Sequence, residues 1–142
     1  MAESAGQIVL DTNIVLDLFV FNDALAQPLR SGLQSGAVRW IATAPMREEL
    51  ARVLAYPKIV QRLQFYQRTA AEVLQHMDTL ALTVGVAPKA CVTCKDADDQ
   101  KFIDLAVAHQ AQLLSKDQAV LCMQKRLLAL GVIAQAAIKT VA

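Results

Sequence analysis

The stretch Ile8-Val9-Leu10-Asp11-Thr12-Asn13 decides the fold. Three bulky apolar residues in a row are typical of a short strand that is buried on both faces, as in a parallel sheet. The run then ends on an acid, a hydroxyl and an amide. Because ligands of parallel α/β sheets bind outside the carboxyl ends of the strands, Asp11 stands where chemistry is expected.

Outward from this stretch, strand-like and helix-like runs alternate along the chain. Strands are predicted at 8–10, 38–42, 112–115 and 132–138, with a short edge strand or extended link at 83–87. Helices are predicted at 14–20, 24–35 (with Leu25, Leu29 and Leu33 as its apolar row), 46–56, 58–65, 69–82, 98–110 and 120–130. This alternation implies parallel crossovers. We therefore predict an α/β fold, a three-layer α/β/α sandwich around a mostly parallel sheet of four to five strands.

Length and composition limit the class of protein. The 142 residues are predicted to form one domain, 1–142. A hydrophobic fraction of 55% fits a sheet covered on both faces or an apolar partner surface, such as that of a homodimer. No apolar run approaches the roughly 18–20 residues of a membrane span, and Met1–Gly6 lacks the features of a secretion signal. We expect a cytoplasmic protein.

The three cysteines do not indicate a disulfide framework, because their number is odd. Cys91 and Cys94 form a C-x-x-C pair. As a zinc site the pair is incomplete, since Cys122 is distant and neither His76 nor His109 stands at ligand spacing. As a redox motif it should open a helix after a strand, whereas here it precedes an acidic segment. We interpret it as loop sequence.

Charge is distributed unevenly although the net charge is only +1. Residues 39–68 carry six bases and two acids, a net charge of +4, and residues 96–104 carry four acids and one base, a net charge of −3. Basic helices beside an acidic focus suit a polyanion held at a metal centre. The alternative is ordinary charge scatter on solvated helix faces.

Helical projection assigns neighbouring acids to different sides of their helices. Glu49 flanks the apolar face of its helix, and Glu48 points almost opposite. In the helix that begins at 98, Asp99 lies in the middle of the apolar face, Asp98 at its edge and Asp104 on the far side. A carboxylate in a packed face needs a partner, because an isolated buried charge is costly.

Four acids share the carboxyl edge of the predicted sheet: Asp11, Glu49, Asp99 and Asp117. Taken singly, each could be a helix cap. Together, four carboxylates within a few ångströms could not all stay ionised without a cation. Oxygen ligands of this kind favour Mg²⁺ or Mn²⁺, which bind phosphates and activate water for attack on a phosphodiester.

At these residues the sequence resembles the PIN-domain ribonucleases, and most closely the toxin components of bacterial toxin–antitoxin pairs. The resemblance rests on four motifs within residues 8–121, namely Val9-Leu10-Asp11-Thr12-Asn13, Arg47-Glu48-Glu49-Leu50-Ala51-Arg52-Val53-Leu54 with Pro57, Asp96-Ala97-Asp98-Asp99 through Phe102 to Ala106, and Leu113-Leu114-Ser115-Lys116-Asp117. Any one motif is weak, whereas the four in this order and spacing are specific.

The resemblance implies four catalytic, metal-binding acids: Asp11, Glu49, Asp99 and Asp117. It also implies that Asn13 and Ser115 orient those carboxylates by hydrogen bonds. The chain departs from the family pattern at two places. Ala97 stands where the family often has proline, and Lys116 stands where it often has glycine, which brings a cation beside the site.

We therefore expect a metal-dependent endoribonuclease with Mg²⁺ or Mn²⁺, the toxin of a toxin–antitoxin pair, whose partners are RNA and an antitoxin. Bases such as Arg47, Arg52 and Lys58 would position the RNA backbone. Two other hypotheses stay open. A receiver-like phosphoryl-transfer domain would want paired acids after its first strand, where Thr12 and Asn13 stand here. A non-catalytic PIN-like domain would bind RNA or protein without cleaving it.

Overall fold

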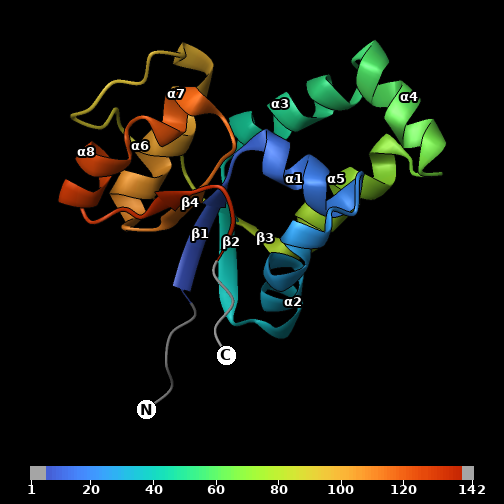
Figure 1. Ribbon diagram of the computed structural model, residues 1–142, viewed down its shortest axis with the longest axis horizontal. Helices are drawn as coiled ribbons and strands as arrows, with labels where there is room; N and C mark the ends of the chain where they lie inside the picture. Colours follow the sequence, from blue (N-terminus) through green and yellow to red (C-terminus); the bar gives the residue numbers. More distant parts are fainter. Residues whose placement is uncertain (1–5, 139–142) are drawn as a thin grey trace.

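A five-stranded sheet forms the centre of the computed structural model, which describes residues 6–138. All neighbouring strands are parallel, in the order β3-β2-β1-β4-β5. The strands are β1 (Gly6–Leu10), β2 (Val38–Ala42), β3 (Ala81–Thr83), β4 (Gln112–Leu114) and β5 (Ala134–Gln135). Helices cover both faces of the sheet (Figure 1). The predicted three-layer α/β/α fold with a parallel sheet is confirmed.

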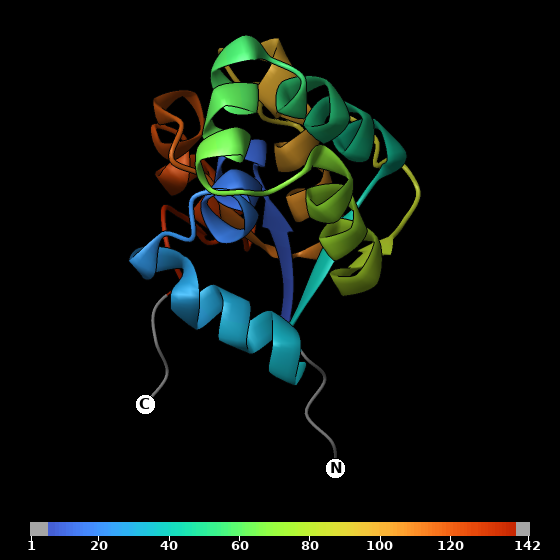
Figure 2. The same cartoon turned by 90° about the vertical axis from the view of Figure 1, so that its right-hand side faces the viewer.

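The helices form one layer on each side of the sheet (Figure 1). One layer, which lies in front in Figure 2, contains α1 (Thr12–Phe19), α2 (Gln27–Ser35), α3 (Ala44–Leu54), α4 (Pro57–Phe65) and α5 (Ala70–Leu80). The other contains α6 (Gln100–His109), α7 (Gln118–Leu121) and α8 (Gln124–Ala129). Single 3₁₀ turns precede α2 and α6, η1 (Ala24–Ala26) and η2 (Ala97–Asp99). Among residues 6–138, no helix has both the length and the apolar character that crossing a membrane requires.

The central strand β1 explains why the opening stretch is so apolar. Ile8, Val9 and Leu10 are buried between α6 on one face and the α1–α5 layer on the other. Ile8 is level with Trp40 of β2 and with Gln112 of β4. From β1 the chain adds β2 and β3 on one side, and then β4 and β5 on the other. The strand order therefore reverses at β1, and such a switch point is the usual place for a ligand site in an open α/β sheet.

The edge strand predicted at 83–87 and the last strand predicted at 132–138 are both shorter than predicted, and the edge strand lies earlier in the chain. β3 begins at Ala81 and ends at Thr83, because it pairs with the last three residues of β2. This ends α5 at Leu80 rather than at Leu82. β5 has only two residues, Ala134 and Gln135, instead of the predicted 132–138, since it pairs only with Leu113 and Leu114 of β4. The prediction that the N-terminal residues form no secretion signal rests partly on residues 1–5. These residues lie outside the part of the chain that the structure describes.

Two helix predictions are also corrected. The single helix predicted at 120–130 is two helices, α7 and α8, separated by a tightened turn in which the Met123 N–H donates to the carbonyl oxygen of Val120. The apolar row predicted in the second helix also fails at its first member. Leu25 is 75% exposed, because it belongs to the 3₁₀ turn η1 and is out of phase with the buried Leu29 and Leu33 of α2.

Candidate metal centre

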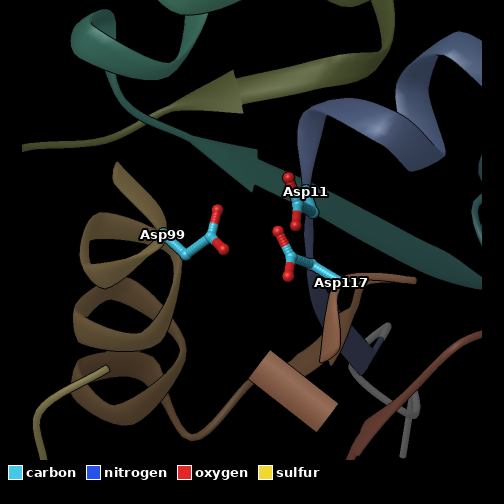
Figure 3. Close-up of side chains that lie close together, drawn as sticks. All are labelled: Asp11, Asp99 and Asp117. Atoms are coloured by element: carbon cyan, nitrogen blue, oxygen red, sulfur yellow. The ribbon is translucent and has the colours of Figure 1, made fainter. Parts of the chain in front are cut away.

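Three of the four predicted acids converge at the carboxyl edge of the sheet. One carboxylate oxygen from each of Asp11, Asp99 and Asp117 lies within 4.8 Å of the other two. Figure 3 shows the three side chains directed toward a common space. The topology causes this convergence. Asp11 follows β1, Asp117 follows the neighbouring parallel strand β4, and α6, which begins just after Asp99, packs on both strands.

The alternative role of these acids as helix caps is testable in their hydrogen bonds. Asp117 does cap a helix, since its Oδ1 accepts from the Ala119 N–H at 2.9 Å. Asp11 and Asp99 also precede helices, but neither side chain makes a capping hydrogen bond. Capping therefore accounts for one of the three acids and leaves two buried carboxylates without that explanation.

Ser115 joins two of the acids. Its hydroxyl is fully buried and donates to Oδ2 of Asp11 at 2.5 Å, while the Asp117 N–H donates to the same hydroxyl at 3.0 Å. Burial raises the pKa of Asp11, and the bond from Ser115 opposes this rise. The hydroxyl thus fixes the orientation of Asp11 relative to the start of α7.

Asp99 is the least satisfied of the three acids. It is 7% exposed, and its Oδ2 is buried without a hydrogen-bond partner among the described residues. Burial, the contact with Asp117 and the negative charge of Asp11 raise the pKa of Asp99 to about 8. A buried carboxylate that faces two further acids lacks a positive partner. The donor set is all oxygen, so the residues fit a hard divalent cation such as Mg²⁺ or Mn²⁺.

Glu49 lies beside the three-acid cluster rather than within it. Its Oε2 accepts from the hydroxyl of Thr12, and its Oε1 lies 2.5 Å from the ammonium of Lys101. Its charge nevertheless contributes to the raised pKa of Asp11, so the two carboxylates are neighbours. The helical projection of the two adjacent glutamates is confirmed, because Glu48 is exposed and Glu49 is half-buried.

Sequence reasoning missed Lys101 as a residue of the site. Besides binding Glu49, its ammonium donates to the carbonyl oxygen of Asp98 and lies 4.9 Å from the centre of the Phe102 ring. In the sequence, Lys101 is the single base of the acidic segment 96–104. Its position two residues after Asp99 was a local signal, but the contact with Glu49 joins residues 52 positions apart.

Lys116 and Asn13 make contacts that the family resemblance does not imply. The Lys116 ammonium lies 2.6 Å from the buried carboxylate of Asp17, an acid outside the three-acid cluster. The Asn13 side chain accepts from the Lys116 N–H at 3.4 Å. Asn13 therefore connects the start of α1 to residues 115–117, the turn after β4 that contains both Ser115 and Asp117.

Other charged residues of the sequence analysis also have partners. The guanidinium of Arg47 makes two hydrogen bonds to Asp78, at 2.7 and 2.9 Å, which hold α3 against α5. These bonds raise the pKa of Arg47 and lower that of Asp78. Asp104, predicted on the far side of its helix, is half-buried and accepts from the Ala90 N–H at 2.9 Å. It anchors the loop that precedes η2.

The cysteines and histidines add no ligand to the cluster within residues 6–138. Cys91 is exposed in a segment without regular structure, as the interpretation of C-x-x-C as loop sequence predicted. The buried thiol of Cys94 donates to the carbonyl oxygen of Ala119 at 3.3 Å, and burial raises its pKa. His76 stacks on Phe19 with ring centres 4.7 Å apart, and His109 is exposed.

Comparison with known proteins identifies the family of the chain. The family profile described as PIN domain matches residues 7–119, which include all four predicted acids. No curated protein matches the sequence. The match covers most of the chain and begins at β1, the strand that places Asp11. On the strength of this match, the chain belongs to the PIN-domain family.

Proposed function

We propose that this protein is a divalent-metal-dependent endoribonuclease. PIN domains are in general nucleases, so a hydrolase of phosphodiester bonds is the broad expectation for the chain. The observation that carries the finer proposal is Asp99. A buried carboxylate with a partnerless oxygen, directed toward two further acids, is an arrangement that a bound cation would stabilise.

The residues divide into three proposed roles. Asp11, Asp99 and Asp117 would hold the cation, which when bound would stabilise charge on the phosphate and lower the pKa of a bound water. Ser115 and Asn13 would support the site by fixing the segment after β4. Glu49 would be the fourth acid, and it would also hold the Lys101 ammonium where a phosphate could meet it.

The proposal is tested with a labelled single-stranded RNA and Mg²⁺ or Mn²⁺. We expect cleavage that EDTA abolishes. We expect Glu49→Gln to lower the rate by about tenfold, because it removes a charge beside the cluster without removing a member of it. The matched control is Glu48→Gln, the exposed neighbour on the same helix turn, with the unmodified rate. Cleavage that survives in EDTA would disprove the metal-dependent mechanism.

We further propose that the nuclease is the cytoplasmic toxin of a toxin–antitoxin pair, with an antitoxin protein as partner and a homodimer as the working form. The support is the resemblance of the four motifs to such toxins. Expression of the chain alone should then arrest growth, and co-expression of the neighbouring open reading frame should relieve the arrest. Normal growth during expression of active nuclease would contradict the toxin role and leave the nuclease proposal standing.

A further inference from the structure

Helix α4 and its two flanking residues expose an unusual set of apolar side chains. Tyr56 and Phe65 are 53% and 77% exposed, and Val60 and Tyr66 are also exposed. Figures 1 and 2 show α4 at the outer edge of the molecule, at the end of α3. Leu63 is its one buried residue. We call the exposed side chains of residues 56–68 the α4 surface.

The aromatic rings of the α4 surface support one another. Tyr66 meets Phe65 edge-on with ring centres 5.0 Å apart, and it lies 6.2 Å from Phe21. The guanidinium of Arg62 lies over the same Phe21 ring at 5.3 Å. Phe65 ends this row of rings and remains open to solvent. A ring held by its neighbours loses little freedom when a flat group stacks on it, and such rigid aromatic contacts favour binding.

The charged residues of the α4 surface and of the end of α3 that precedes it have one sign. From Leu50 to Ala71 the chain carries no acid and four exposed bases, Arg52, Lys58, Arg62 and Arg68. A second copy of the chain that docked through this same surface would bring like charges together, which disfavours a homodimer here. Positive charge interleaved with exposed rings instead complements a polyanion that also presents flat, apolar faces.

We infer that the α4 surface binds single-stranded nucleic acid. Unpaired nucleobases would stack on rings such as Phe65. The basic side chains of residues 52–68 would contact the phosphates. The inference rests on the proposed nuclease function and deepens it. Helix α3 connects the two sites, because it carries Glu49 beside the acid cluster and leads to α4. Five helical steps, about 7.5 Å, separate Glu49 from Leu54 at the end of α3, and α4 begins three residues later at Pro57, so a strand that follows α3 can reach both.

Binding is measured by fluorescence anisotropy with a labelled 12-nucleotide RNA in EDTA, where metal-dependent cleavage cannot occur. We expect Phe65→Ala to weaken binding by about tenfold through the loss of one stacking contact, and Phe65→Trp to retain it. Leu128→Ala, which removes an exposed apolar side chain from α8 on the other side of the sheet, is the matched control with unchanged affinity. The same RNA as a duplex should bind more weakly than the single strand.

Two results overturn the inference, namely equal affinities of Phe65→Ala and the unmodified protein, or equal affinities for duplex and single strand. Either would indicate another occupant, such as an acidic protein segment. Hydrolysis of bis(4-nitrophenyl) phosphate with Mn²⁺ by the unmodified protein tests the acid cluster separately, because this small diester cannot span both sites. If Phe65→Ala weakens RNA binding but the unmodified protein does not hydrolyse the small diester, only the nuclease proposal is contradicted. Hydrolysis without an effect of Phe65→Ala on binding would sink the α4 inference alone.

Discussion

Asp99→Asn is expected to reduce metal-dependent RNA cleavage by at least about a hundredfold while leaving the protein folded. Asparagine keeps the size of the side chain but removes the charge that a divalent cation requires. In EDTA at pH 8.5, where Asp99 is ionised, the variant is expected to melt at a higher temperature than the unmodified protein, because a carboxylate that faces Asp11 and Asp117 with a partnerless oxygen is unfavourable without a cation. Initial rates and thermal melts in EDTA measure the two effects.

The matched control is Asp98→Asn, which removes the same charge one residue earlier. The Asp98 side chain is exposed and lies outside the three-acid cluster. We expect Asp98→Asn to change the rate and the melting temperature little. If both variants lose activity equally, the general negative charge of residues 96–104 matters rather than the convergence of three carboxylates, and the metal centre is wrongly placed.

The stabilising effect of Mg²⁺ is expected to be large at pH 8.5 and small at pH 5. The pKa of Asp99 is about 8 in the folded protein, against an ordinary value of 3.8. Between these values the folded state binds more protons than the unfolded state, so the free energy of unfolding falls as the pH rises. The metal-free protein therefore loses stability from about pH 4 to pH 8. The raised pKa of Asp11 acts in the same direction.

A cation that binds the ionised acids reverses this loss. At a metal concentration 100 times its Kd the stabilisation is about 2.7 kcal/mol, roughly 10 °C in melting temperature for a domain of this size. At pH 5 protons compete for Asp99, so the shift should be a small fraction of this. Thermal melts with Mg²⁺ and with EDTA at both pH values measure the difference. Equal shifts at the two pH values, or a full shift in Asp99→Asn, would contradict the assignment.

The parts of the fold that the sequence predicted well are those with their own local signal. The apolar run of Ile8 to Leu10 is typical of a strand covered on both faces, and it is the centre of the sheet. The sides of Glu48 and Glu49 followed from helical period because α3 is a regular helix. The wrong predictions concern elements whose length or helical phase depends on contacts with other parts of the chain. β5 is short because only two residues of β4 pair with it. Leu25 is exposed because the 3₁₀ turn η1 interrupts the helical period of residues 24–35.

In the candidate site, too, the positions set by local sequence were predicted and the contacts set by tertiary packing were not. The positions of Asp11 and Asp117 after strands were readable, since parallel strands end at one edge. The contacts that separate Glu49 from the cluster were not, because Thr12 and Lys101 reach it across 37 and 52 residues. The pairing of Lys116 with Asp17 is likewise set by the packing of the β4 turn against α1. Side-chain direction at such places depends on tertiary neighbours, which a single sequence does not specify.

The bond from Ser115 to Asp11 joins residues 104 positions apart, and this spacing has a consequence during synthesis. A ribosome makes Asp11 first and Asp117 near the end of the PIN-domain segment. Until β4 has emerged and paired beside β1, a nascent chain lacks the third acid and the hydroxyl that orients the first. If the cluster is the nuclease centre, the growing polypeptide cannot attack the message that encodes it. On that condition, cleavage would require β4 to have paired beside β1.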